Sequence, residues 1–216
     1  LDNLLFSYHT WTIDDAYQHK PTAADLKPYG LVIWSQPHAS PGYIEAWAAL
    51  SEYLDGGGKL FISGEEIGYF DHATDEYLRY LGAAYVADDG GLGPISGIEG
   101  DILEGIELSY NTADSACNQT SPDIIAPGSD LGRALQQTRD GRLLALRGDG
   151  CAFRTVYLSY GLEGVGPAVR RDQVLERAIS WMQQSRPSRA VHIWAPVREA
   201  SVTIGGASEA RASYDL

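Results

Sequence analysis

The stretch KLFISGEEIG, residues 59–68, decides how the rest of the chain is arranged. Leu60, Phe61 and Ile62 form a short apolar run between Gly56–Gly58 and Gly64, which is typical of a strand covered on both faces. A turn of the form Gly-x-x-x-Gly follows at once and carries two carboxylates. Open α/β sheets place functional groups at the carboxyl ends of their strands. The turn is therefore the first candidate for a site.

The residues before this stretch predict a βαβ unit. Residues 30–35 (GLVIWS) are a continuous apolar strand, and Ser40-Pro41 is typical of a helix start. Apolar residues at helical spacing continue to Leu54, and the glycines at 56–58 end the helix. A strand, a helix and a second strand in this order indicate parallel pairing with a right-handed crossover.

The remaining elements are expected on both sides of this unit. Asp140-Gly141 indicates a hairpin turn, and residues 88–105 and 114–127 are rich in turn residues and predict irregular loops. Strands are expected at residues 6–13, 83–87, 133–138, 142–147 and 154–160, and helices at residues 74–81 and 174–182. Three short β-like runs follow, at residues 190–194, 201–204 and 209–214. We expect a first domain at residues 1–186, and a β extension or the start of a β-sandwich domain at residues 187–216.

Composition narrows the class of function. The 216 residues are 44% hydrophobic, which suffices for one well-packed domain, and the net charge is −13 with a pI near 4.6. Such a charge repels phosphate backbones, so no nucleic-acid partner is expected. No run approaches the roughly 18 apolar residues of a membrane helix, so no membrane association is expected. Cys117 and Cys151 lack metal-type spacing, and a disulfide between them is one alternative if the protein is exported.

Several strings resemble the class I glutamine amidotransferase-like superfamily. They are residues 25–34, 53–64 and 174–181. Within that superfamily, residues 1–184 look most like the flavodoxin-like domains appended to secreted bacterial peptidases. The resemblance implies a flavodoxin-like three-layer αβα sandwich with a mostly parallel sheet. It also implies a secreted, multidomain parent protein, whose other domains would be the partners of this one; a homo-oligomer is a further alternative.

The residues at the catalytic positions of that superfamily differ here. Its nucleophile elbow is Gly-x-Cys-x-Gly, and a later strand supplies His-x-Glu. In this chain Glu66 stands at the cysteine position, Gly161 at the histidine position and Glu163 at the glutamate position. Hydrolysis of glutamine requires an activated thiolate, which a carboxylate does not replace. Amidotransferase activity is therefore not expected.

Three interpretations of the acidic turn remain open. Glu65, Glu66 and Glu163 could converge at the carboxyl edge of the sheet, and Asp71 and His72 lie close in sequence. In the structural interpretation, Glu66 hydrogen-bonds backbone amides around the turn. In the second, the carboxylates bind a ligand or a divalent cation such as calcium. In the third, Glu66 and Glu163 form an acid/base pair of a hydrolase, which would be metal-assisted or act on carbohydrate.

Other motifs add little to these interpretations. Asp88-Asp89 before two glycines resembles part of a calcium loop but lacks its closing glutamate, so we interpret it as a turn. No nucleotide-binding motif follows a strand, and no organic cofactor is expected. Carbohydrate binding would require exposed Trp or Tyr beside the carboxylates, whereas Trp34, Trp47 and Trp181 are expected in the core. The leading expectation is a non-catalytic accessory, interaction or ligand-binding module, and the alternative is the hydrolase.

Overall fold

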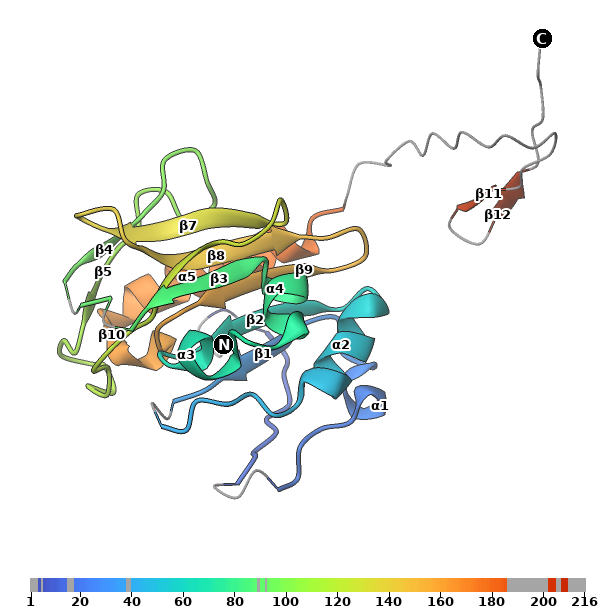
Figure 1. Cartoon of the computed structure of the whole chain (residues 1–216), viewed down its shortest axis with the longest axis horizontal. Coiled ribbons are helices and arrows are strands. Elements are labelled where there is room, and N and C mark those ends of the chain that lie inside the picture. Colours follow the sequence, from blue (N-terminus) through green and yellow to red (C-terminus); the bar gives the residue numbers. More distant parts are fainter. Residues whose placement is uncertain are drawn as a thin grey trace, which may run out of the picture. The chain divides into compact units, whose positions relative to one another are not determined.

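The structure is a computed structural model that describes residues 4, 6–14, 18–37, 40–88, 90–91, 93–185, 202–204 and 207–209 (Figure 1). The chain divides into two units, Leu1–Gln184 and Ser185–Leu216. The described part of the second unit is an antiparallel hairpin of β11 and β12. The candidate site lies in the first unit.

The elements have the following bounds: α1 (Ala23–Leu26), β1 (Val32–Ser35), α2 (Trp47–Asp55), β2 (Lys59–Ser63), α3 (Ile67–Asp71), α4 (Asp75–Leu81), β3 (Ala83–Ala87), β4 (Ile95–Gly97), β5 (Glu107–Tyr110), β6 (Ile124–Pro127), β7 (Gly132–Thr138), β8 (Leu143–Asp149), β9 (Arg154–Leu158), the 3-10 helix η2 (Leu162–Gly164), β10 (Val165–Gly166), α5 (Ala168–Gln183), β11 (Val202–Ile204) and β12 (Ala207–Glu209).

The sheet of the first unit is mixed. β2 lies between β1 and β9 and pairs with both in parallel, so that Phe61 is opposite Ile33 and Val156. The other pairings of this sheet among the described residues are antiparallel, along the path β9-β8-β7-β4-β5-β10 and through β6, which joins β3 to β8. The α/β class is confirmed, but the expectation of a mostly parallel sheet is wrong. Short connections such as residues 150–153 between β8 and β9 can join antiparallel neighbours only.

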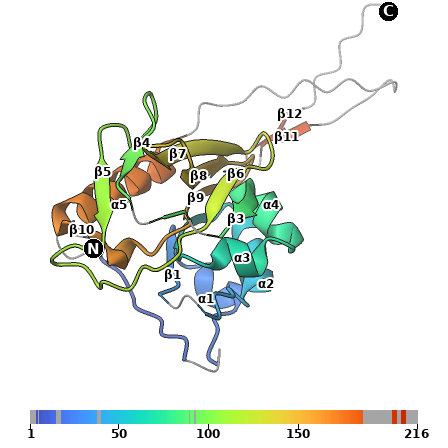
Figure 2. The ribbon, with the colours of Figure 1, turned by 60° about the vertical axis from the view of Figure 1, so that its left-hand side comes forward.

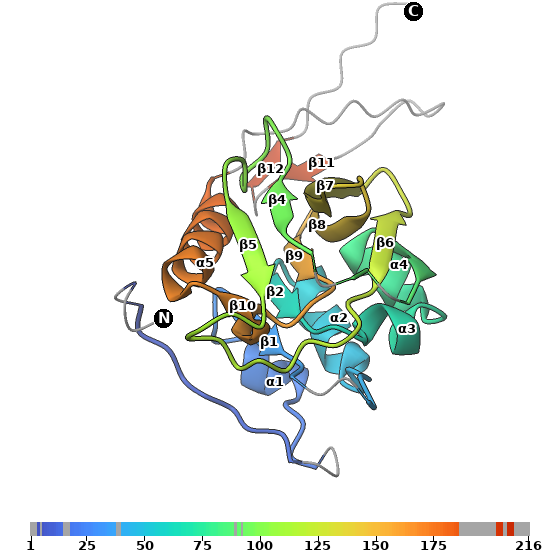
Figure 3. The same cartoon turned by 90° about the vertical axis from the view of Figure 1, so that its left-hand side faces the viewer.

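Helices cover both faces of the strands around β2. Leu60 and Ile62 of β2 pack in one core with residues of α2 and α4, while Phe61 points to the other face and packs in a second core with residues of α5. Figure 3 shows α5 on one side of β2, β8 and β9 and α3 and α4 on the other. The apolar run of the opening stretch is thus buried on both faces, as its sequence predicts.

The βαβ unit is confirmed, although its helix is shorter than expected. α2 begins at Trp47 instead of at Ser40-Pro41. Glu45 has a φ of 48°, in the left-handed region, which a right-handed helix does not accommodate. The residues just before α2 are instead tied to α3, since the Ile44 amide donates to Asp71 Oδ2 at 3.0 Å.

Several other expectations about the elements need correction. The loops predicted at residues 88–105 and 114–127 contain the short strands β4 and β6. Both strands form by pairing with strands that are distant in the sequence. Residues 6–13, expected as a strand, form no regular element. They border a groove of about 920 Å³ along β1, whose lining includes the exposed rings of Tyr8 and Trp11.

The remaining expectations about single residues have mixed outcomes. Trp34, Trp47 and Trp181 are buried, as expected for core residues. Cys117 and Cys151 are both exposed and are not joined by a disulfide. The β-like run at residues 190–194 lies outside the described residues. Among the described helices, none combines the length and the apolar character that crossing a membrane requires.

Candidate functional site

Three carboxylates meet beside the β2–α3 turn. One carboxylate oxygen from each of Glu66, Asp88 and Asp123 lies within 4.8 Å of the other two, and we call these residues the acidic cluster. Glu66 belongs to the turn after β2, Asp88 follows β3 and Asp123 precedes β6. β3 and β6 are antiparallel, with Ala87 opposite Ile124. Asp88 follows Ala87 and Asp123 precedes Ile124, so this pairing brings the two aspartates together. Figure 2 shows α3 beside β3 and β6.

The two glutamates of the turn have opposite environments. Glu65 is buried, and its carboxylate accepts hydrogen bonds from the Thr120 amide at 2.7 Å, the Thr120 hydroxyl at 2.8 Å and the Ser121 amide at 3.2 Å. Glu66 precedes the first residue of α3, yet its side chain makes no capping hydrogen bond. Bonding to backbone amides, which the structural interpretation assigned to Glu66, is therefore the role of Glu65.

Asp123 is the buried member of the acidic cluster. Its Oδ2 accepts a hydrogen bond from the Tyr69 amide at 3.0 Å, in the first turn of α3. Its Oδ1 is buried and has no hydrogen-bond partner among the described residues. Gly68 permits this approach, because a Cβ there would lie 2.8 Å from Asp123 Oδ2. The cluster therefore contains a carboxylate oxygen that is shielded from solvent and unsatisfied by the described groups.

Convergence of the carboxylates changes their acidity. Burial raises the pKa of Glu66 to about 7, and the charges of Asp88 and Glu65 add to this effect. Burial also raises the pKa of Asp123 to about 8, with contributions from the charges of Glu66 and Asp88 against the hydrogen bonds from Tyr69 and Gly68. Asp88 is exposed and accepts a hydrogen bond from the Ser121 hydroxyl. At neutral pH the cluster therefore favours either a proton or another cation.

Glu163 lies in η2 and is not a member of the acidic cluster. Its Oε1 accepts a hydrogen bond from Asn118 Nδ2 at 3.0 Å. A Cβ at Gly161 would overlap Glu163 Oε1 and would lie 2.6 Å from Gln119 Nε2. The space in which the superfamily's histidine would stand is therefore filled by Glu163 and Gln119.

One loop connects these acidic groups. Residues 118–123 contact Glu163 through Asn118 and Glu65 through Thr120 and Ser121, and they end at Asp123. The Asp123 amide donates to the Glu65 carbonyl at 3.2 Å. The loop thus brings a third carboxylate to Glu66, where the sequence had suggested Glu163.

The other two predicted site residues have mainly structural contacts. Asp71 is buried and accepts from the Ile44 amide, and burial raises its pKa. His72 Nδ1 lies 2.9 Å from the Tyr69 carbonyl, and its ring stacks on Tyr85. Neither residue belongs to the acidic cluster.

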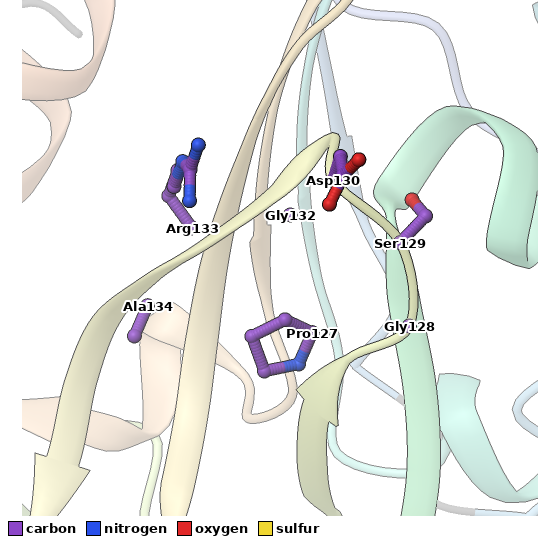
Figure 4. A pocket seen from close by; sticks show the side chains of 7 residues that line it. All are labelled: Pro127, Gly128, Ser129, Asp130, Gly132, Arg133 and Ala134. Atoms are coloured by element: carbon purple, nitrogen blue, oxygen red, sulfur yellow. The ribbon is translucent and has the colours of Figure 1, made fainter.

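The sequence interpretation missed Asp123 and treated Asp88 as a turn residue. A usable signal existed for Asp88, because it directly follows the strand at residues 83–87. Asp123 had no such signal, since β6 was not recognised. A second, shallow pocket lies where β6 connects to β7. Figure 4 shows the residues that line it, which are Pro127, Gly128, Ser129, Asp130, Gly132, Arg133 and Ala134.

Comparison with known proteins gives structural neighbours only. No protein-family model matches the sequence, and no curated protein is similar to it. The exo-β-1,4-mannosidase Op5Man5 from Opitutaceae bacterium strain TAV5 is 16% identical with a TM-score of 0.47, over 76% of this chain and 26% of that protein. Gan42B, a GH42 β-galactosidase from G. stearothermophilus, is 13% identical with a TM-score of 0.48, over 72% of this chain and 22% of that protein. A protein from Bacteroides uniformis described as ThuA-like is 11% identical with a TM-score of 0.44, over 74% of this chain and 72% of that protein.

The chain thus spans about a quarter of the length of the two glycosidases. At these identities and TM-scores the likeness carries no functional argument.

Proposed function

We propose that this domain is a non-catalytic ligand-binding module that holds a hard divalent cation at the acidic cluster. The observation that carries the proposal is the buried, unpartnered Oδ1 of Asp123 beside two further carboxylates. A buried acceptor without a partner costs free energy. A cation between Glu66, Asp88 and Asp123 would satisfy this oxygen and neutralise the mutual repulsion.

The donor set favours a particular class of ion. The cluster consists of carboxylates, which suit Ca²⁺, Mg²⁺ or Mn²⁺ better than the softer transition metals. Asp123 is buried, Glu66 is half-buried and Asp88 is exposed, so the cluster is open on one side. A bound cation would keep coordination positions on that side for water or for a second ligand.

The amidotransferase positions argue against the reaction of that superfamily. Glu66 provides no thiol, and the filled space at Gly161 leaves no room for an imidazole. We infer that the domain descends from a flavodoxin-like, amidotransferase-type ancestor and serves as an accessory module of an exported multidomain protein. Peptidase domains are the partners that we propose.

Thermal unfolding with added metal tests the cation site. We expect CaCl₂ or MnCl₂ at pH 8.5 to raise the Tm of the full chain, because an ion that binds only the folded state stabilises it. Asp123→Asn should abolish the rise. The matched control Glu52→Gln removes an exposed carboxylate of α2 and should preserve it. If none of Ca²⁺, Mg²⁺ and Mn²⁺ raises the Tm of the wild type at about 10 mM, above the range of weak extracellular calcium sites, the proposal is wrong.

A hydrolase remains the second candidate, because Glu66 is accessible and has a pKa of about 7. Such a value suits a general acid at neutral pH. Its neighbours would be Asp88 and Asp123 instead of Glu163. Release of nitrophenol from aryl glycosides by the wild type, lost in Glu66→Gln and kept in Glu163→Gln, would support this candidate over the binding module.

A further inference from the structure

Five aromatic rings in continuous contact lie next to the acidic cluster, and we call them the aromatic platform. The ring centroids are 4.5 Å apart for Tyr43 and Phe70, 5.1 Å for Phe70 and Tyr69, 6.1 Å for Tyr69 and Tyr85, and 4.9 Å for Tyr85 and His72. Three of these residues come from α3 and its C-cap, one from β3 and one from the segment before α2. The platform and the acidic cluster therefore both use α3 and β3, whereas Asp123 of the cluster precedes β6.

One hydrogen bond and one electrostatic interaction link the platform to the acidic cluster. The Tyr69 amide donates to Asp123 Oδ2, so the residue that carries this ring bonds directly to the Asp123 carboxylate. The pKa of the Tyr85 hydroxyl is raised by burial and then by the charges of Asp123 and Asp88, with a smaller contribution from Glu66. The Tyr85 side chain is thus within electrostatic range of all three members of the cluster.

The exposure of the platform differs from that of ordinary packed tyrosines. Tyr69 is 48% exposed and Tyr43 is 40% exposed, whereas Tyr77 and Tyr80 in the core are 1% exposed. Packing of α3 against β3 explains why Phe70 and Tyr85 are partly covered. It does not explain why the rings of Tyr69 and Tyr43, which both contact Phe70, remain open to solvent. Contiguous exposed aromatic surface is typical of a ligand site.

We propose that the acidic cluster and the aromatic platform form one carbohydrate-binding site in which the cation bridges sugar hydroxyls to the protein. This inference rests on the cation site proposed above. Vicinal hydroxyls are hard oxygen ligands and can complete the coordination of Ca²⁺ on the open side of the cluster. The C–H face of a pyranose ring is apolar and packs on an exposed tyrosine such as Tyr69.

The combination of features selects this ligand over two others. A purely apolar peptide would use the rings but would leave the carboxylates uncompensated. An organic cation would use both features but would compete with the metal for the cluster. A polyol uses the metal and the rings together, so its binding should depend on both.

Affinity electrophoresis of the full chain in gels that contain mannan, galactan, xylan or glucan tests the inference. We expect at least one polysaccharide to retard the wild type in CaCl₂ but not in EDTA. Tyr69→Ala should weaken this binding about tenfold or more, as expected for loss of an aromatic stack. The control Phe6→Ala removes an exposed ring outside the platform and should leave retardation unchanged.

Calcium titration calorimetry of the same variants separates the two proposals. Tyr69→Ala should bind Ca²⁺ like the wild type, and Asp123→Asn should lose both Ca²⁺ and polysaccharide. Normal Ca²⁺ binding without retardation by any of the four polysaccharides would overturn the carbohydrate inference and leave the cation site standing. Retardation that persists unchanged in EDTA, or in Tyr69→Ala, would also overturn it, as would displacement of Ca²⁺ by tetramethylammonium. Absence of Ca²⁺, Mg²⁺ and Mn²⁺ binding would overturn the proposed function itself.

Discussion

Glu65 and Glu66 are chemically identical neighbours, but substitution of Glu65 should cost much more stability than substitution of Glu66. Glu65 is buried and accepts three hydrogen bonds from Thr120 and Ser121, so Glu65→Ala leaves these donors unpaired. We expect it to lower the free energy of unfolding by about 2–4 kcal/mol. Glu66→Ala removes no capping bond and relieves repulsion, so it should change the free energy by less than about 1 kcal/mol. Urea unfolding in EDTA at pH 7 compares the two; equal losses would contradict the assignment of roles.

The raised pKa values of Asp123 and Glu66 determine how stability varies with pH. Both carboxyls hold their protons more tightly in the folded chain than in the unfolded chain, with pKa values of about 8 and 7. Their stabilising contribution is complete below pH 4 and is lost as pH rises to 8. Each proton bound in excess by the folded state gives a slope of about 1.4 kcal/mol per pH unit.

We therefore expect the metal-free wild type to lose stability between pH 5 and pH 8, apart from the contributions of other groups. Asp123→Asn should reduce this slope, because the amide resembles the protonated acid and can still accept from the Tyr69 amide. Chemical denaturation in EDTA at pH 5, 6.5 and 8 measures the slope for both proteins. Glu52→Gln, which removes an exposed carboxylate, should retain the slope of the wild type. Identical slopes in Asp123→Asn and the wild type would show that Asp123 titrates normally.

At the scale of elements, η2 and the loop at residues 118–123 pack closely against Gly161, which has no side chain. Glu163 and Gln119 occupy the space that a side chain would need. The double variant Glu66→Cys, Gly161→His restores the superfamily's residue types. The histidine side chain should overlap Glu163 and Gln119, and this overpacking should lower the free energy of unfolding by about 1–3 kcal/mol. We expect no release of ammonia from glutamine. Measurable glutaminase activity would show that the loop adapts and that the thiol was the main loss.

The buried side chain of Arg154 bonds the C-terminus of α5. The Arg154 guanidinium donates to the carbonyls of Trp181 at 2.5 Å and Gln184 at 2.9 Å, and it stacks over the Trp181 ring. Arg154→Met keeps most of the apolar stem but leaves these carbonyls without their donor. We expect the free energy of unfolding to fall by about 2–3 kcal/mol and amide exchange in the last turn of α5 to become faster. Arg133→Met, on the exposed part of β7, is the matched control and should have little effect.

The sequence predicts those elements whose signals are local. β1, β2 and the hairpin of β7 and β8 follow from apolar runs, glycine stops and Asp140-Gly141, where Gly141 has a φ of 86°. The short strands β4 and β6 have no such signal, because their pairing partners stabilise them. The site shows the same limit: Glu66 lies where the turn predicts it, but the meeting of Asp88 and Asp123 depends on the pairing of Ala87 with Ile124.

At the scale of the whole molecule, the cores of the first unit define what the chain needs in order to fold. The buried residues of both core clusters lie between Leu26 and Met182 among the described residues. The described part of the second unit is a two-stranded hairpin, and such a hairpin contributes little stability alone. The boundary near Pro187 predicted from the sequence can therefore be tested by truncation.

We expect a chain that ends at Ser185 to unfold cooperatively, with a Tm within about 2 °C of the full chain and with the same affinity for Ca²⁺. The matched control ends at Ser180 and lacks Trp181 and Met182, which are buried in the core beneath α5. The free energy of unfolding of this control should be lower by several kcal/mol, as expected for removal of two large buried side chains. Differential scanning calorimetry and calcium titration of the three chains provide the comparison. If the chain ending at Ser185 is as unstable as the one ending at Ser180, residues 186–216 complete the first unit, and the two-domain division is wrong.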